Sequence, residues 1–354
     1  MDTNRKNKIV AYWLLTGIFM IIVQVLLGGV TRLTGSGLSI TEWKPIMGAL
    51  PPMGESEWQA AFQKYQGIAQ YKYLNNHFTL GDFKFIFFWE WFHRLWARFL
   101  GVVFAIPFIY FIVKRYFSKD MVIPLVILFI LGGAQGLIGW IMVDSGLNDT
   151  NLYVNHIKLS IHFISALVLL CYTLWFALKL LVPARDIVRD KPLHNFLLGA
   201  IVLLTVQLIY GAFMAGLKAA MAAATWPTIN GDWIPAGLGS NSWINHPINV
   251  HFVHRGLAYI LFVVVIAGFV KVSRVARQTG SATLLRSARY PLVLVCLQVL
   301  LGIFTVISAP KIVPGHFGLF EILAEAHQLV AMFLLIALTV QLFLVRSKGA
   351  GSLA

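Results

Sequence analysis

The sequence predicts an all-α integral membrane protein, with eight transmembrane helices arranged as two tandem four-helix bundles related by a parallel internal repeat. Three observations predict this fold. Hydrophobic residues make up 58% of the 354 residues and charged residues only 12%, about half the share of a soluble domain. Apolar runs long enough to cross a bilayer recur eight times. The last four runs repeat features of the first four in the same order.

About 20 consecutive apolar residues cross a bilayer as one helix. The basic segment Met1–Lys8 precedes the first run, and no small-residue cleavage site follows that run, so we expect a retained helix and not a removed signal peptide. The lack of an Arg- and Ser-rich transit segment favours a bacterial inner membrane over an organelle. The predicted spans are residues 9–30, 85–113, 122–143, 156–182, 194–216, 249–271, 290–309 and 320–345.

Lys and Arg are concentrated in alternate connections, which predicts that these connections face the cytoplasm and that both termini lie there. The net charge of +14 therefore indicates membrane orientation and lipid contact, and it does not indicate nucleic-acid binding. The long loops 31–84 and 217–248 are expected outside, as ordered caps. The basic segments are the N-terminus, 114–120, 183–192, 271–289 and 346–348.

The internal repeat can be followed residue by residue. Four spans separate each match, and because four is even, the two halves insert with the same orientation. We therefore expect an N-terminal half at 1–182, a cytoplasmic linker at 183–192 and a C-terminal half at 193–354. The matches pair Val23–Gly29 with Val206–Ala212, Phe92–Arg94 with Val253–Arg255, Gln135–Gly139 with Gln298–Gly302, and His156–His162 with Glu321–His327.

Four histidines recur at matched positions, His93 and His162 in the first half and His254 and His327 in the second. They lie at similar depth near the outer ends of their spans. Two imidazoles at one depth are the axial ligands that a six-coordinate haem iron needs. A single histidine in a span is usually a packing residue, but this recurrence favours ligands. Zinc or copper would need a third ligand, which each half lacks.

Arginine and lysine near these histidines are candidates to bind the anionic haem propionates: Arg94, Arg255 and Lys158. Gln24, Gln135, Gln207 and Gln298 also recur in the repeat, and we expect them to form hydrogen bonds between helices. The histidines expected in loops or at span ends are His77, His194, His246 and His316.

Glu90 distinguishes the two halves, because the repeat pairs it with His251. On a helix, Glu90 shares a face with His93 three residues later. A carboxylate in an apolar pocket can accept or deliver protons. We therefore assign chemistry on a bound haem-like substrate to the first half, and a permanent haem that passes electrons to the second. The alternative is that Glu90 pairs with Arg94, four residues on.

Together these residues resemble the haem A synthase family over essentially the whole chain. The resemblance rests on Gly28–Ile40 with Trp43, on Glu90–Arg94, on His254–Arg255 and on Glu325–Gln328. Some members carry a cysteine pair in the first outer loop, and residues 31–84 contain none. The chain is therefore more similar to the proteobacterial and mitochondrial branch.

The resemblance implies oxidation of the C8 methyl group of haem O to a formyl group, through an alcohol and a hydrated aldehyde, giving haem A for terminal oxidases. By the same resemblance, His93 and His162 hold the substrate haem, Glu90 serves catalysis, and His254 and His327 ligate haem b. Haem O synthase, oxidase assembly factors and an electron carrier are the partners to expect.

Two other functions compete with this prediction. A cytochrome b-type electron carrier with two haems, linked to quinol, accounts for the four histidines but gives Glu90 no task. A transporter would suit duplicated halves, but it predicts charged residues near the middle of the bilayer, whereas here they are clustered toward one face.

Overall fold

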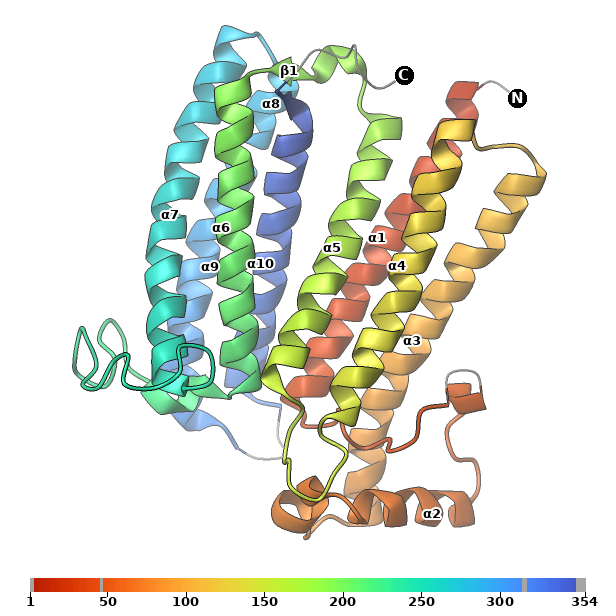
Figure 1. The fold of residues 1–354 in the computed structure, drawn as a ribbon, viewed down its shortest axis with the longest axis vertical. Coiled ribbons are helices and arrows are strands. Elements are labelled where there is room, and N and C mark those ends of the chain that lie inside the picture. The colour runs from red at the N-terminus through yellow and green to blue at the C-terminus, as the bar shows by residue number, and fades with distance from the viewer. Residues whose placement is uncertain (1–2, 45–46, 314–316, 348–354) are drawn as a thin grey trace.

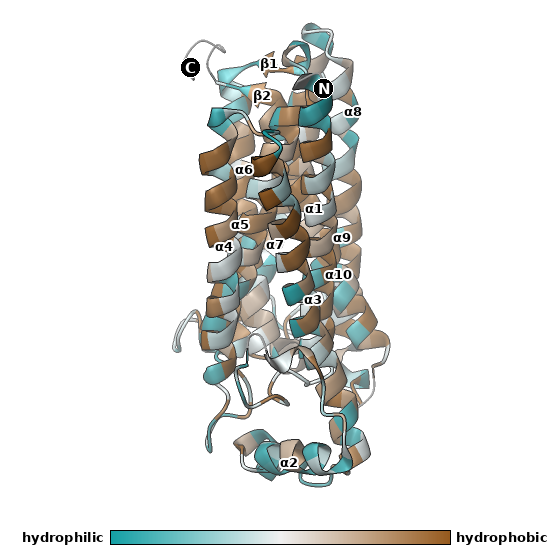
Figure 2. Ribbon diagram, turned by 90° about the vertical axis from the view of Figure 1, so that its right-hand side faces the viewer, coloured by the Kyte–Doolittle hydropathy of each residue, from teal (hydrophilic) through white to brown (hydrophobic). Residues whose placement is uncertain are grey.

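The computed structural model describes residues 3–44, 47–313 and 317–347, and the regular secondary structure in this part of the chain is helical apart from two short strands. Its helices include eight that are long and apolar enough to cross a membrane, which confirms the predicted number. Figure 1 shows them side by side, with helix α2 lying across one end of the bundle, called here the α2 end. Figure 2 shows hydrophobic residues along the middle of the helices and hydrophilic residues on α2 and near the helix ends. His316 lies outside the described residues.

The long helices are α1 (Thr3–Leu33), α3 (Leu80–Val113), α4 (Lys119–Asp144), α5 (His156–Leu181), α6 (Lys191–Gly216), α7 (Pro247–Gln278), α9 (Arg289–Ser308) and α10 (Leu319–Leu344). The shorter elements are α2 (Glu55–Gln66), a π-helical turn at Tyr71–Asn75, α8 (Ala282–Ser287), and 3₁₀ turns at Met47–Ala49, Ala184–Asp186, Ala219–Ala223 and Ala309–Lys311. The strands are β1 (Val188–Arg189) and β2 (Val345–Arg346).

Side-chain caps fix several of the helix starts. At α5, the side chain of Asn155 accepts hydrogen bonds from the backbone N–H groups of Ile157 and Lys158. At α6, Asp190 accepts one from Leu193 N at 2.7 Å. Such caps satisfy N–H groups that have no partner within the helix, and each stabilises the helix by about 1 kcal/mol.

Helix α7 continues seven residues beyond its predicted end at 271. The basic residues Lys271, Arg274 and Arg277 therefore lie on a helix, and α8 occupies much of the remaining connection to α9. The predicted span ends at 271, seven residues before the helix does, because hydropathy marks where the apolar part ends and a helix can continue beyond it with polar residues.

Helices α1, α5, α6 and α10 form the centre of the bundle, because they contact one another across the two predicted halves. Helices α3 and α4 lie outside α1 and α5, and α7 and α9 lie outside α6 and α10 (Figure 1). One hydrophobic core includes residues of the central and the outer helices. Its buried members on the central helices include Leu14 and Ile21 of α1, Leu170 and Leu174 of α5, Leu204 and Leu208 of α6, and Leu334 and Leu338 of α10.

The first long loop folds into an ordered cap with its own small core at the α2 end, as predicted. Phe62 and Tyr65 of α2 pack with Phe83 and Phe87 at the start of α3. The Tyr65 hydroxyl is within hydrogen-bond distance of Gln70 and Asn75, and burial raises its pKa to about 12. The cap is therefore fixed directly to the helix that carries Glu90 and His93.

At the opposite end, the linker between α5 and α6 meets the end of α10. Val188 and Arg189 pair in parallel with Val345 and Arg346. The start of α1 and the end of α10 also lie at this end (Figure 1). The division at 183–192 stays a prediction, and these contacts attach that linker to the last helix.

We expect the buried and exposed leucines of one helix turn to differ in their effect on stability. Leu197 is 1% exposed and Leu198, the next residue of α6, is 46% exposed. Leu197→Ala should lower the free energy of unfolding in detergent by about 2 kcal/mol or more, because it leaves a cavity. Leu198→Ala is the matched control and should change it by about 0.5 kcal/mol or less. Equal losses would contradict the packing of α6.

Candidate haem-binding site

Each of the four matched histidines lies against a glutamine from the preceding long helix. The glutamine amide nitrogen is within hydrogen-bond distance of a ring nitrogen in every case, which confirms the predicted bonds between helices. The pairs are Gln24–His93 at 3.0 Å, Gln135–His162 at 3.1 Å, Gln207–His254 at 3.2 Å and Gln298–His327 at 3.3 Å. An amide that bonds one ring nitrogen fixes the orientation of the imidazole. In His327 the second nitrogen, Nδ1, is also held, at 3.1 Å from the backbone carbonyl of Gln298, and the amide of Gln207 lies 3.5 Å from the second nitrogen of His254.

A glycine one helical turn after each glutamine lies beside the same imidazole. A Cβ placed on it would come within 2.8–3.3 Å of the ring's Cε1 atom, so a larger residue would push the ring away. The four glycines are Gly28, Gly139, Gly211 and Gly302. This role was missed in the sequence, although the spacing Gln-x-x-x-Gly recurs in four spans and is the signal that could have shown it.

His254 and His327 form a close pair between α7 and α10. Their ring centroids are 6.4 Å apart and their planes are inclined by 73°. Two metal–nitrogen bonds of about 2 Å, plus the distance from each nitrogen to its ring centre, account for a separation of this size. The pair therefore fits a single metal ion held between two imidazoles, as in a haem with two axial histidines.

His93 and His162 are the corresponding residues of α3 and α5. The two imidazoles are near enough to interact electrostatically. The Nδ1 atom of His93 is buried and has no hydrogen-bond partner among the described residues. A buried ring nitrogen without a partner is costly, which indicates that a bound group completes this site.

Glu90 is 3% exposed and is held by three donors. The Ser39 hydroxyl and the Ile40 backbone N–H donate to Oε2 at 2.7 and 2.8 Å, and Arg94 Nη2 donates to Oε1 at 2.5 Å. The pairing with Arg94, given above as the alternative, is thus present. Glu90 attaches the first loop to α3 one turn from His93, and its catalytic role stays a prediction.

Arg94 also donates to the backbone carbonyls of Ile40 and Glu42, at 3.1 and 3.2 Å. Glu42 in turn accepts ion pairs from Lys44 and Lys64. Hydrogen bonds from these two lysines lower the pKa of the Glu42 carboxyl. The guanidinium of Arg94 therefore ties the loop to the helix, and binding of a propionate by Arg94 stays a prediction.

Arg255 has the equivalent place in the second half. Its guanidinium donates to the backbone carbonyls of Ala223, Thr225 and Thr228, at 3.1, 2.6 and 3.0 Å. These residues belong to the second long loop, so Arg255 holds that loop on α7 beside His254. Its predicted role toward a propionate likewise stays a prediction.

Two further polar side chains are buried without hydrogen-bond partners among the described residues. Both ring nitrogens of His251 and both carboxyl oxygens of Glu325 lack one. His251 is one turn before His254, and Glu325 is two residues before His327. Buried polar atoms without partners indicate that a group present in the working protein completes their surroundings.

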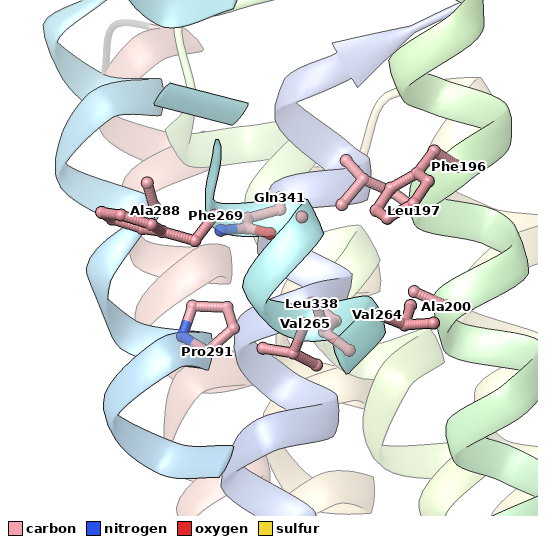
Figure 3. Close-up of a pocket in the computed structure, with 11 residues that line it drawn as sticks. Phe196, Leu197, Ala200, Val264, Val265, Phe269, Ala288, Pro291, Leu338 and Gln341 are labelled. Atoms are coloured by element: carbon pink, nitrogen blue, oxygen red, sulfur yellow. The ribbon is translucent and has the colours of Figure 1, made fainter. Parts of the chain in front are cut away.

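A separate cavity lies away from these histidines, between α6, α7, α9 and α10. It has a volume of about 10 Å³, room for about one water, and Figure 3 shows its lining of Phe196, Leu197, Val265, Pro291 and Leu338, with Gln341 the polar side chain among them. It is too small for a macrocycle.

Comparison with known proteins shows which family the chain resembles. The model of the COX15–CtaA family, described as a cytochrome oxidase assembly protein, matches residues 11–339. The chain is 39% identical to the haem A synthase of Flavobacterium johnsoniae over 344 residues, 95% of this chain and 97% of that protein. It is 42% identical to that of Rhodospirillum centenum over 311 residues (85% and 81%) and 38% identical to that of Paracoccus denitrificans over 336 residues (92% and 85%).

We expect Arg255→Lys to loosen the second loop, because one ammonium group cannot reach three carbonyls as a planar guanidinium does. Limited proteolysis should then cut between residues 219 and 232 faster than in the unmodified protein. Arg274→Lys, at an exposed position of the same helix, is the control and should leave the cutting rate unchanged. Equal protection in Arg255→Lys and the unmodified protein would show that the guanidinium does not hold the loop.

Proposed function

The chain belongs to the COX15–CtaA family of cytochrome oxidase assembly proteins, and from this premise we propose that it makes haem A from haem O. The reaction oxidises the C8 methyl group of haem O to a formyl group. The observation that carries the proposal is the set of four buried histidines, each supported by a glutamine and a glycine. Glu90 lies one turn before His93, where the repeat has His251 before His254. The resulting haem A would serve terminal oxidases.

His254 and His327 are the residues that would hold a resident haem b. The 6.4 Å between their ring centroids supports this assignment, as do the amides of Gln207 and Gln298 that orient the rings. When bound, a haem with two histidine ligands supplies one-electron transfer. The protein's part is to keep both imidazoles neutral, oriented and enclosed in an apolar bundle.

His93 and His162 would hold the substrate, haem O. Gln24 and Gln135 orient these imidazoles in the same way, and the unpartnered Nδ1 of His93 supports a missing bound group. The first loop, attached by Glu90 and Arg94, covers this end of α3 and limits access of water. Positioning of the methyl group and exclusion of water are what the fold supplies to such a reaction.

Glu90 would have two tasks in the first site. Its Oε2 atom holds Ser39 and Ile40, and its carboxylate is the proton acceptor one turn from His93. In the second half the matched residue is His251, which makes no such attachment to a loop within the described residues. This difference supports placing the chemistry in the first half.

The proposal places the chain in a bacterial inner membrane with the α2 end outside. Alternate short connections carry the basic residues, as the positive-inside rule requires of cytoplasmic segments. Haem O synthase and oxidase assembly factors are the partners that would deliver substrate and accept product, and a separate electron carrier would exchange electrons with haem b. Membrane lipid surrounds the exposed apolar faces of α3 and α4.

Glu90→Ala should leave haem b bound and lower the conversion of haem O by about 100-fold or more, the scale of a lost acid–base group. Haem A and haem O extracted from membranes would be the measurement. Ser39→Ala is the matched control, since it removes one loop bond and keeps the carboxylate. Normal haem A output from Glu90→Ala would contradict its catalytic role, and an equal loss in Ser39→Ala would reduce that role to holding the loop.

His254→Ala or His327→Ala should abolish the low-spin haem b spectrum of the purified protein, because each removes one axial ligand. His77→Ala, at an exposed loop position, is the control and should keep that spectrum. An unchanged reduced-minus-oxidised spectrum in either ligand variant would refute the assignment of this pair.

A further inference from the structure

Helices α1 and α10 bring the neighbours of Gln24 and His327 into direct contact. Helix α1 belongs to the first predicted half and carries Gln24, which bonds His93. Helix α10 belongs to the second half and carries His327, with Gln328 as its next residue. The Gln328 amide donates to the backbone carbonyl of Val25, the residue after Gln24, at 3.3 Å.

These contacts form a continuous chain of bonds between two of the matched histidines. From the His93 ring, a contact of 3.0 Å reaches the amide nitrogen of Gln24. The backbone leads from Gln24 to the carbonyl of Val25, and the second hydrogen bond leads to Gln328. Gln328 is joined covalently to His327. Two hydrogen bonds and otherwise covalent bonds thus connect the two sites.

Adjacent glycines let α1 lie close to both sites at once. Gly28 lies beside the imidazole of His93, and Gly29 lies beside the carboxyl group of Glu325 on α10; a Cβ at either position would meet these groups too closely. Consecutive helix residues point about 100° apart, so one turn of α1 contacts both halves. The glycine pair therefore lets one turn of α1 lie close to His93 on one side and to Glu325 of α10 on the other.

We propose that this α1–α10 junction, Gln24–Gly29 against Glu325–Gln328, is the route by which the two histidine sites exchange electrons. The proposal rests on the proposed function, which places a haem in each site. Electronic coupling falls off less steeply along covalent and hydrogen bonds than across an unbridged gap, and the junction supplies such a path. One electron moves at a time: the donating site is oxidised by one equivalent, the receiving site is reduced by one, and no proton or third reactant is consumed.

The test uses purified full-length protein that holds haem b and haem O. Laser-flash photoreduction with a soluble flavin delivers one electron, and the separate absorption bands of the two haems report its movement from one site to the other. Gln328→Met removes the donor and keeps an unbranched side chain of similar length. Gln341→Met is the matched control, because Gln341 makes the same type of bond from α10, to Ser287 O at 3.0 Å, away from α1.

We expect Gln328→Met to slow the exchange between haems while both haem contents and the low-spin spectrum stay as in the unmodified protein, and Gln341→Met to leave the rate unchanged. Gln328→Leu is the second variant if methionine disturbs haem binding. An unchanged rate in the Gln328 variants, or an equal fall in Gln341→Met, would overturn the junction's role. Failure of the proposed function would appear differently, as unmodified protein that binds no haem O.

Discussion

The hydrogen bond from a glutamine to a buried imidazole is the interaction on which the rest of this structure depends. An imidazole in the apolar interior of a membrane protein is costly unless its nitrogens are bonded. Each of the four histidines is held by an amide from the preceding long helix and has a glycine beside its ring. These contacts hold each imidazole in a defined orientation, as an axial ligand requires, and His327 is held at both nitrogens because its Nδ1 also bonds the backbone carbonyl of Gln298.

Each of the four histidines has the same glutamine and glycine contacts, so the two predicted halves differ in a few other residues near these histidines. In the first half, Glu90 and Arg94 attach the loop at Ser39–Glu42 to α3. In the second half, Arg255 alone of the matched residues makes the equivalent attachment, and His251 is buried without a partner in the described part of the chain. Glu90 beside His93, where the second half has His251 beside His254, would give two similar haem sites different chemistry.

Much of this could be predicted from the sequence, because apolar runs and matched histidines are local signals. The eight spans follow from run length, and the four glutamine bonds follow from residues that recur at fixed spacing. The carbonyl targets of Arg94 and Arg255 could not be predicted, because they depend on how two loops fold. The helical cap at Glu55–Gln66 and the pairing of Val188 with Val345 depend likewise on tertiary contacts. The predicted span that corresponds to α7 ends too early, at 271, because a helix can continue beyond the apolar residues that mark a membrane span.

The contact between α1 and α10 joins the two predicted halves directly. Each predicted half carries two of the four histidines, and the turn of α1 that supports His93 also accepts a bond from the residue after His327. The central place of α1, α5, α6 and α10 in one core keeps this contact fixed. A shared core favours a fixed separation between the two sites.

Extraction of the pigments from the purified protein tests the central claim most directly. If two histidine pairs hold a resident haem and a haem substrate, the extract contains haem b together with haem O, haem A or a hydroxylated form between them. An extract with haem b as its sole haem would contradict the account and would favour a two-haem electron carrier.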